Sequence, residues 1–119
     1  MTVTATRIPM LIEGEWINSD SSASIPVTNP ATQEVLAHTP CATDDEMTRA
    51  MSSAQRAFET WKEVPVPQRA RLMLKYQALL KEHHDELATI LAEETGKTFE
   101  DAKGDVWRGI EVVEHACNA

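Results

Sequence analysis

Several residue types are scarce in this sequence, and each shortage excludes a class of function. Its 119 residues hold two cysteines, and its 11 lysines and arginines are outnumbered by 19 aspartates and glutamates. Cys41 and Cys117 are too few for a disulfide framework, so we expect a reducing compartment. The net charge of −8 argues against a nucleic-acid partner, because phosphate binding needs clustered basic side chains.

Long apolar runs are also missing. No stretch approaches the roughly 20 consecutive apolar residues that a membrane helix needs. The first ten residues have no apolar run behind the single charge of Arg7, unlike a secretory signal or a transit peptide. With 42% hydrophobic and 25% charged residues, the composition is that of a globular protein. We therefore expect a cytoplasmic protein with no membrane partner.

Glycine is too sparse for a phosphate-binding loop. The four glycines cannot form the G-x-G-x-x-G pattern of dinucleotide sites. Gly96-Lys97-Thr98 looks like the end of a phosphate loop, but Leu91 stands where that loop needs a glycine and a helix precedes it. We interpret the segment as a helix break with a solvated lysine, and we predict no cofactor-binding residue.

The pattern of the first third of the chain, residues 9–40, predicts strands. Apolar residues flank Glu13-Gly14, and a glycine there permits the positive φ of a tight hairpin between residues 10–12 and 15–17. Residues 24–28 and 34–39 form a second pair. Pro26 cannot donate to a ladder, so its strand belongs at an edge.

From Thr43 onward the apolar period becomes helical, and four helices are expected over residues 43–119. Thr43 and Glu46 form a capping box. Pro67 suits the start of the second helix, Gly96 the end of the third, and Thr98 the start of a fourth that continues to Ala119. The fold class is thus α+β, with β-hairpins at residues 9–40 before four helices, in a single partial domain spanning 1–119.

Each helix has an apolar stripe at helical spacing, and the stripe of the second helix is expected to be buried. The stripes are Met47, Ala50, Met51, Ala54, Phe58 and Trp61; Leu72, Met73, Tyr76, Leu79 and Leu80; Leu87, Ile90 and Leu91; and Ala102, Val106, Ile110, Val113 and Cys117.

The histidines and cysteines of the sequence give little support for a metal site or a catalytic nucleophile. His83 and His84 are adjacent on a helix and so point about 100° apart, which prevents them from sharing one ion. We interpret them as exposed imidazoles at a helix junction. Cys117 lies on an apolar stripe, where a thiol acts as a small hydrophobic group, and Cys41 has no base beside it. We predict no metal ligand and no catalytic residue in this chain.

Arg108 is the strongest candidate for a functional side chain. On the fourth helix it lies opposite the apolar stripe, where further apolar residues indicate a second covering surface. Judged on the residues alone, ordinary surface ion pairs with Asp105 and Glu111 are the better interpretation, and such pairs contribute little stability.

Together, several segments resemble the opening of the aldehyde dehydrogenase superfamily, over roughly residues 9–119. They are residues 11–16 (LIEGEW), 29–35 (NPATQEV), 54–61 with an Ala-Phe-x-x-Trp spacing, and the Glu93-x-x-Gly96-Lys97 turn. Residues 104–109 (GDVWRG) and 112–117 (VVEHAC) resemble the methylmalonate-semialdehyde dehydrogenases in particular.

This resemblance implies a function for the whole enzyme. Such enzymes oxidise methylmalonate or malonate semialdehyde with NAD and CoA, releasing carbon dioxide and propionyl-CoA or acetyl-CoA, in valine and myo-inositol breakdown. The resemblance also implies that Arg108 holds the substrate carboxylate, and this replaces the surface ion-pair interpretation reached from the residues alone. It implies, in addition, that the full-length enzyme is a homo-oligomer.

The resemblance further implies that this chain is the N-terminal fragment of the cofactor-binding domain. The catalytic cysteine, the dinucleotide-binding sheet and the oligomerisation strands of the family lie beyond residue 119. We therefore expect the isolated chain to be inactive and marginally stable, and to bind neither NAD nor CoA. Two alternatives stay open: a fragment of a non-acylating semialdehyde dehydrogenase, and a stand-alone helical protein-interaction module.

Overall fold

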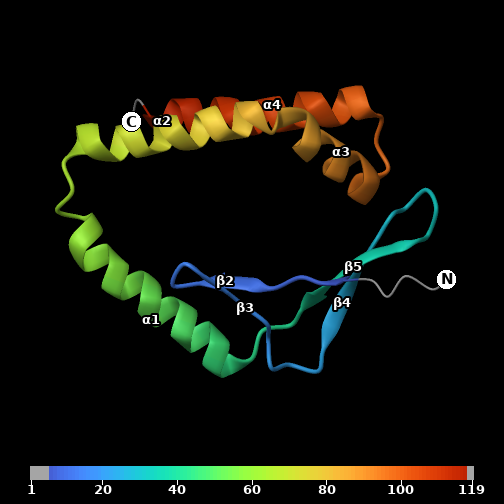
Figure 1. The fold of residues 1–119 in the computed structure, drawn as a ribbon, viewed down its shortest axis with the longest axis horizontal. Coiled ribbons are helices and arrows are strands. Elements are labelled where there is room, and N and C mark those ends of the chain that lie inside the picture. Colours follow the sequence, from blue (N-terminus) through green and yellow to red (C-terminus); the bar gives the residue numbers. More distant parts are fainter. Residues whose placement is uncertain (1–5, 118–119) are drawn as a thin grey trace. The chain divides into compact units, whose positions relative to one another are not determined.

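The computed structural model describes residues 6–117, in which five strands precede four helices (Figure 1). The chain divides into two compact units, Met1–Glu63 and Val64–Ala119, and each is described by itself. The first unit holds all five strands and the helix α1, and the second holds helices α2, α3 and α4. The predicted order of strands followed by four helices, and with it the α+β class, is confirmed.

A tight hairpin joins β2 (Met10–Ile12) to β3 (Glu15–Ile17). Both turn residues are left-handed, Glu13 with φ 59° and Gly14 with φ 80°, as in the turn type that matches the twist of a two-residue hairpin. The predicted role of Gly14 is confirmed. A glutamate with a positive φ is less common than a glycine, and the side chain of Glu13 is held by ion pairs. Its carboxylate pairs with Arg56 and lies 3.6 Å from the Nε of Arg49, both on α1 (Asp44–Trp61).

A separate three-stranded sheet has the order β1-β5-β4. Its centre is β5 (Val35–Pro40), which pairs antiparallel with β4 (Ser24–Thr28) and parallel with β1 (Thr6–Arg7). Pro26 lies in an edge strand, as predicted. The strand β1 was not predicted, because two residues are too short to show any alternation, and its partner β5 lies far along the chain.

The start of α1 is fixed by the predicted capping box. The Thr43 hydroxyl accepts a hydrogen bond from the Glu46 amide at 3.2 Å, and the Glu46 carboxylate accepts one from the Thr43 amide at 2.7 Å. The same carboxylate also accepts hydrogen bonds from the Asp20 amide (2.8 Å) and the Ser19 hydroxyl (2.9 Å). Glu46 therefore joins the loop before β4 to the first turn of α1. These bonds, led by that from Thr43, lower the pKa of Glu46 below its ordinary value of 4.5.

We expect Glu46 to give the first unit a stability that depends on pH. Its pKa is depressed in the folded chain, so the stabilisation is present above the unfolded value and is lost as pH falls through the folded value. In a heteronuclear NMR titration of the 119-residue chain, the Thr43 and Asp20 amide resonances should shift with one common midpoint below pH 4.5. Glu46→Gln should abolish that titration and lower the melting temperature at pH 7, with the difference closing in acid. A midpoint at or above 4.5 would contradict the arrangement.

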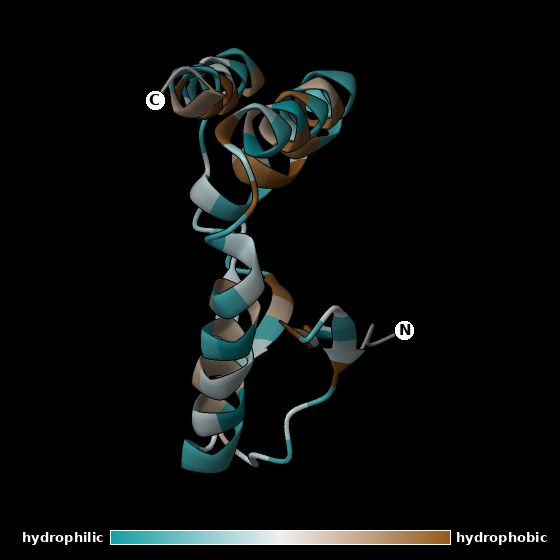
Figure 2. Cartoon of the chain, turned by 90° about the vertical axis from the view of Figure 1, so that its left-hand side faces the viewer, coloured by the Kyte–Doolittle hydropathy of each residue, from teal (hydrophilic) through white to brown (hydrophobic). Residues whose placement is uncertain are grey.

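Within residues 6–117, no residue of α1 is fully buried. Met51 and Phe58 are more than half exposed, at 62% and 55%. Figure 2 shows hydrophilic and hydrophobic residues side by side along this helix. The predicted helix with its apolar residues on one face is confirmed.

The second unit packs α2 (Val66–Glu82) and α3 (His84–Thr95) against α4 (Phe99–Cys117). Within the described residues its buried apolar side chains are Ala88, Ala102 and Ile110. One buried polar residue, Gln77, donates a hydrogen bond from its Nε2 to Glu114 at 2.9 Å, and thereby links α2 to α4. The two small alanines permit the close approach of α3 and α4.

The predicted buried stripe of α2 is wrong in detail. On α2 the residue that faces α4 most fully is Gln77, whereas Leu72, Tyr76 and Leu79 remain about half exposed. On α3 the buried residue is Ala88, and Ile90 is exposed. Hydrophobicity alone misled the prediction, because α4 covers a narrower face of each helix than its apolar residues span.

The predicted end of α3 and the predicted start of α4 are confirmed. Gly96 caps α3 in the left-handed region with φ 70° and donates to the Ala92 carbonyl. The Thr98 hydroxyl accepts from the Asp101 amide at 3.2 Å at the start of α4. The predicted continuation to Ala119 lies outside the described residues. No helix within residues 6–117 is long and apolar enough to cross a membrane.

Candidate functional site

A polar groove of about 370 Å³ lies along one face of α4 in the second unit. The turn before the helix contributes Lys97, and the other lining residues recur every three to four positions, so they share one helix face. Its lining consists of Lys97, Glu100, Asp101, Gly104, Asp105 and Arg108. A Cβ atom built on Gly104 would meet nothing within 4 Å, which leaves this part of the groove open.

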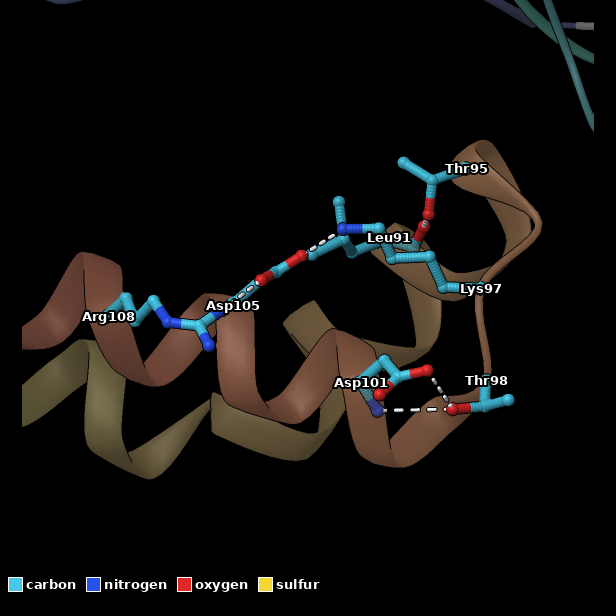
Figure 3. Close-up of polar contacts among 7 residues, drawn as sticks. All are labelled: Leu91, Thr95, Lys97, Thr98, Asp101, Asp105 and Arg108. Carbon is cyan, nitrogen blue, oxygen red and sulfur yellow. Dashed lines mark hydrogen bonds and ion pairs between the residues drawn. The ribbon is translucent and has the colours of Figure 1, made fainter.

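Three charged side chains form a chain within this groove (Figure 3). One oxygen of the Asp105 carboxylate accepts a hydrogen bond from Arg108 Nη1 at 2.6 Å, and the other accepts one from Lys97 Nζ. The hydrogen bond from Lys97, followed by the positive charges of Lys97 and Arg108, lowers the pKa of Asp105. The carboxylate thus stays ionised, and the group of three carries two positive charges and one negative.

Arg108, the site residue predicted from the sequence, lies on the exposed side of α4. Its side chain is 75% exposed, against 30% for Asp105. Within residues 6–117 it pairs with Asp105 and not with Glu111, the other partner that the sequence suggested. A guanidinium has five N–H donors in a planar fork, so most of them remain available to a second anion. The geometry suits a carboxylate ligand.

Lys97 is not simply solvated, as the sequence had suggested. The helix break at Gly96 is confirmed, but the ammonium of Lys97 reaches across the turn to Asp105. The two residues are eight positions apart, with Lys97 in the turn before α4 and Asp105 on the helix itself. Spacing along a single helix could not reveal this contact.

One of the two adjacent histidines is also more enclosed than predicted. His83 is exposed, with Nδ1 2.8 Å from a Glu86 oxygen. The His84 side chain is only 21% exposed, because its ring packs edge-on against Trp107 and its Nε2 donates to the Lys103 carbonyl at 3.0 Å. His84 therefore links α3 to α4. Among residues 6–117, no group of three His, Cys, Asp or Glu side chains could hold a metal ion.

The two cysteine thiols differ from each other in exposure. Cys117 is half-buried and its Sγ donates to the Val113 carbonyl at 3.2 Å, whereas Cys41 is exposed. Among the described residues, neither thiol forms a hydrogen bond with a histidine.

An apolar pocket of about 390 Å³, which the sequence did not predict, lies among the three helices of the second unit. It is lined by Tyr76, Leu80, Leu87, Ile90, Leu91, Glu94, Val106, Gly109, Ile110 and Val113. Its lining includes Tyr76 and Leu80 of the α2 stripe, all three residues of the α3 stripe, and Val106, Ile110 and Val113 of the α4 stripe.

Comparison with known proteins gives a consistent result. Residues 16–119 match the model of the aldehyde dehydrogenase family. The chain is 48% identical over 111 residues to a mitochondrial, acylating methylmalonate-semialdehyde dehydrogenase of Arabidopsis thaliana, covering 93% of this chain and 18% of the plant enzyme. It is 49% identical over 116 residues to malonate-semialdehyde dehydrogenase 3 of Geobacillus kaustophilus, covering 98% of this chain and 24% of that enzyme.

A solved structure supports the same relationship. The crystal structure of a proposed methylmalonate-semialdehyde dehydrogenase from Sinorhizobium meliloti 1021, complexed with NAD, superposes with a TM-score of 0.90 at 35% identity. The match covers 96% of this chain and 23% of that one. The chain therefore spans at most about a quarter of the length of the relatives that it matches.

Proposed function

This chain belongs to the aldehyde dehydrogenase family, and we propose that it serves as part of an NAD-dependent, CoA-acylating enzyme that oxidises malonate or methylmalonate semialdehyde. The reaction would convert the semialdehyde, CoA and NAD into acetyl-CoA or propionyl-CoA, carbon dioxide and NADH, as in valine and myo-inositol breakdown. The names of both relatives support this substrate class, and the plant relative supports acylation.

The observation that carries the proposal is the available guanidinium of Arg108. A malonate-type semialdehyde differs from a simple aldehyde by one carboxylate, and a planar guanidinium binds a carboxylate through two parallel hydrogen bonds. Arg108 is exposed, lines an open groove and is already paired with one carboxylate in a geometry that a second could share. We propose that it anchors the substrate carboxylate, while the aldehyde carbon faces a nucleophile outside this chain.

The remaining chemistry belongs to the rest of such an enzyme. A nucleophilic cysteine would form a hemithioacetal that transfers hydride to NAD, and neither role falls to a residue of this chain. We propose that residues 1–119 fold as one partial domain of a cytoplasmic homo-oligomer, although the plant relative is named as mitochondrial. Alone, the chain should bind no cofactor and show no turnover.

A hybrid enzyme tests the proposed function. Residues 1–119 would replace the matching segment of the Geobacillus kaustophilus relative. We expect the purified hybrid to form NADH and acetyl-CoA from malonate semialdehyde only when CoA is present, and the isolated chain to form neither. NADH formation without CoA would favour the non-acylating alternative. A hybrid that is folded, as judged by its melting transition, yet inactive on semialdehydes would contradict the proposal.

A further inference from the structure

We propose that Asp105 is a positioning residue that holds Arg108 in the orientation needed to bind the substrate carboxylate, and that Lys97 offsets the negative charge of Asp105 beside the guanidinium. The inference rests on the proposed function of Arg108 and adds two residues to it. Nothing in the spacing of the family motif assigns these roles; they follow from the contacts in the groove.

The first step is that Asp105 is itself held in place. Both of its oxygens are engaged, one by Lys97 and one by Arg108, and its side chain is less than half as exposed as that of Arg108. Lys97 directly follows the left-handed cap at Gly96, so it extends from a turn whose backbone is fixed at both ends, by the cap of α3 and the start of α4. Asp105 is thus an anchored group rather than a freely rotating surface carboxylate.

The second step is that Arg108 needs such an anchor. A long side chain that projects into solvent samples many rotamers, and binding a carboxylate through two parallel hydrogen bonds restricts it to one. The hydrogen bond from Nη1 to Asp105 restrains the guanidinium through a single nitrogen. Its other N–H groups stay available to a ligand entering the groove. Preorganisation of this kind increases affinity without an additional contact to the ligand.

The third step concerns charge. An isolated Asp105–Arg108 pair would be neutral and would attract an anion weakly. Lys97 restores one positive charge to the group of three. Asp101 is bonded to the Thr98 hydroxyl at 2.8 Å, which leaves its negative charge in place, and Figure 3 shows this pair apart from the line of Lys97, Asp105 and Arg108. Glu100 also lines the groove. With these two further acids present, Lys97 is the group that offsets Asp105 beside the guanidinium.

Kinetics of the hybrid enzyme test the positioning role. Propanal carries a methyl group where malonate semialdehyde carries its carboxylate. A change in KM that is seen with malonate semialdehyde but not with propanal therefore reflects binding of the carboxylate. We expect Asp105→Asn to raise the KM for malonate semialdehyde by about 5- to 20-fold, with kcat and the KM for propanal unchanged. Lys97→Gln should raise the same KM by about threefold, and this effect should fade at high salt.

A double-mutant cycle separates positioning from an independent effect. If Asp105 acts through Arg108, then Asp105→Asn should add nothing once Arg108→Ala is present. Glu111→Gln provides the matched control, because this exposed carboxylate is also three residues from Arg108 but does not pair with it in the described structure. It should leave both KM values unchanged.

Each other outcome overturns the inference. A lower KM in Asp105→Asn would mean that Asp105 competes with the substrate. Equal losses on malonate semialdehyde and propanal, or loss of the folded hybrid in both Asp105→Asn and Lys97→Gln, would mean a structural role only. If Arg108→Ala raises the KM for malonate semialdehyde but not for propanal, and Asp105→Asn changes neither KM, the positioning role fails while the proposed function stands. If Arg108→Ala shows no selectivity, both fail.

Discussion

Replacing Arg108 with alanine in the hybrid enzyme should raise the KM for malonate semialdehyde by about 10- to 100-fold and leave the KM for propanal within about twofold. The expected size follows from the loss of charge-assisted hydrogen bonds to one carboxylate. Little stability should be lost, because the side chain is 75% exposed and its single pairing is a surface ion pair. Steady-state NADH formation with both aldehydes measures the effect.

The conservative variant sharpens this expectation. Arg108→Lys keeps the charge but lacks the planar fork, so it should recover only part of the affinity for malonate semialdehyde. Full recovery would show that a point charge suffices and that the guanidinium geometry is irrelevant. Equal losses for both aldehydes in Arg108→Ala would show instead that Arg108 supports the local structure, and the proposed anchoring role would be abandoned.

The composition of the site was only partly predictable from the sequence. The helical spacing placed Arg108 opposite the apolar stripe and named Asp105 as a partner, and both are confirmed by the structure. Its role in substrate binding came from the family resemblance and stays a prediction. The contact of Lys97 was missed because Lys97 lies in the turn before α4, outside the helix, so helical spacing does not relate it to Asp105.

The fold was most predictable where one residue type satisfies one backbone requirement. Gly14 in the hairpin, the Thr43–Glu46 capping box and the Gly96 cap are all of this kind. Predictions failed where a tertiary partner decides the outcome. Hydrophobicity favoured Leu72 over Gln77 for the buried face of α2, but Gln77 is buried because Glu114 on the neighbouring helix accepts its hydrogen bond.

The largest stability effect should follow from Ile110→Ala. Ile110 is 1% exposed and lies on the face of α4 that packs in the second unit, whereas the other buried apolar residues there are alanines. Truncating such a side chain removes contacts and leaves a cavity, at a typical cost of about 2–5 kcal/mol. A unit that spans only residues 64–119 has little stability to lose. We therefore expect the variant chain to lose cooperative unfolding of this unit, or to unfold at much lower urea.

Fluorescence of Trp107, which lies on α4, can report this unfolding by itself. Trp16 and Trp61 lie in the first unit and are exposed, so replacing both with phenylalanine leaves a single tryptophan in the second. Val112→Ala is the matched control, because this aliphatic residue is on the same helix but 67% exposed, and it should change the unfolding free energy by no more than about 0.5 kcal/mol. Equal costs for the two variants would mean that Val112 is also covered in solution, and therefore that the exposed face of α4 associates with another surface.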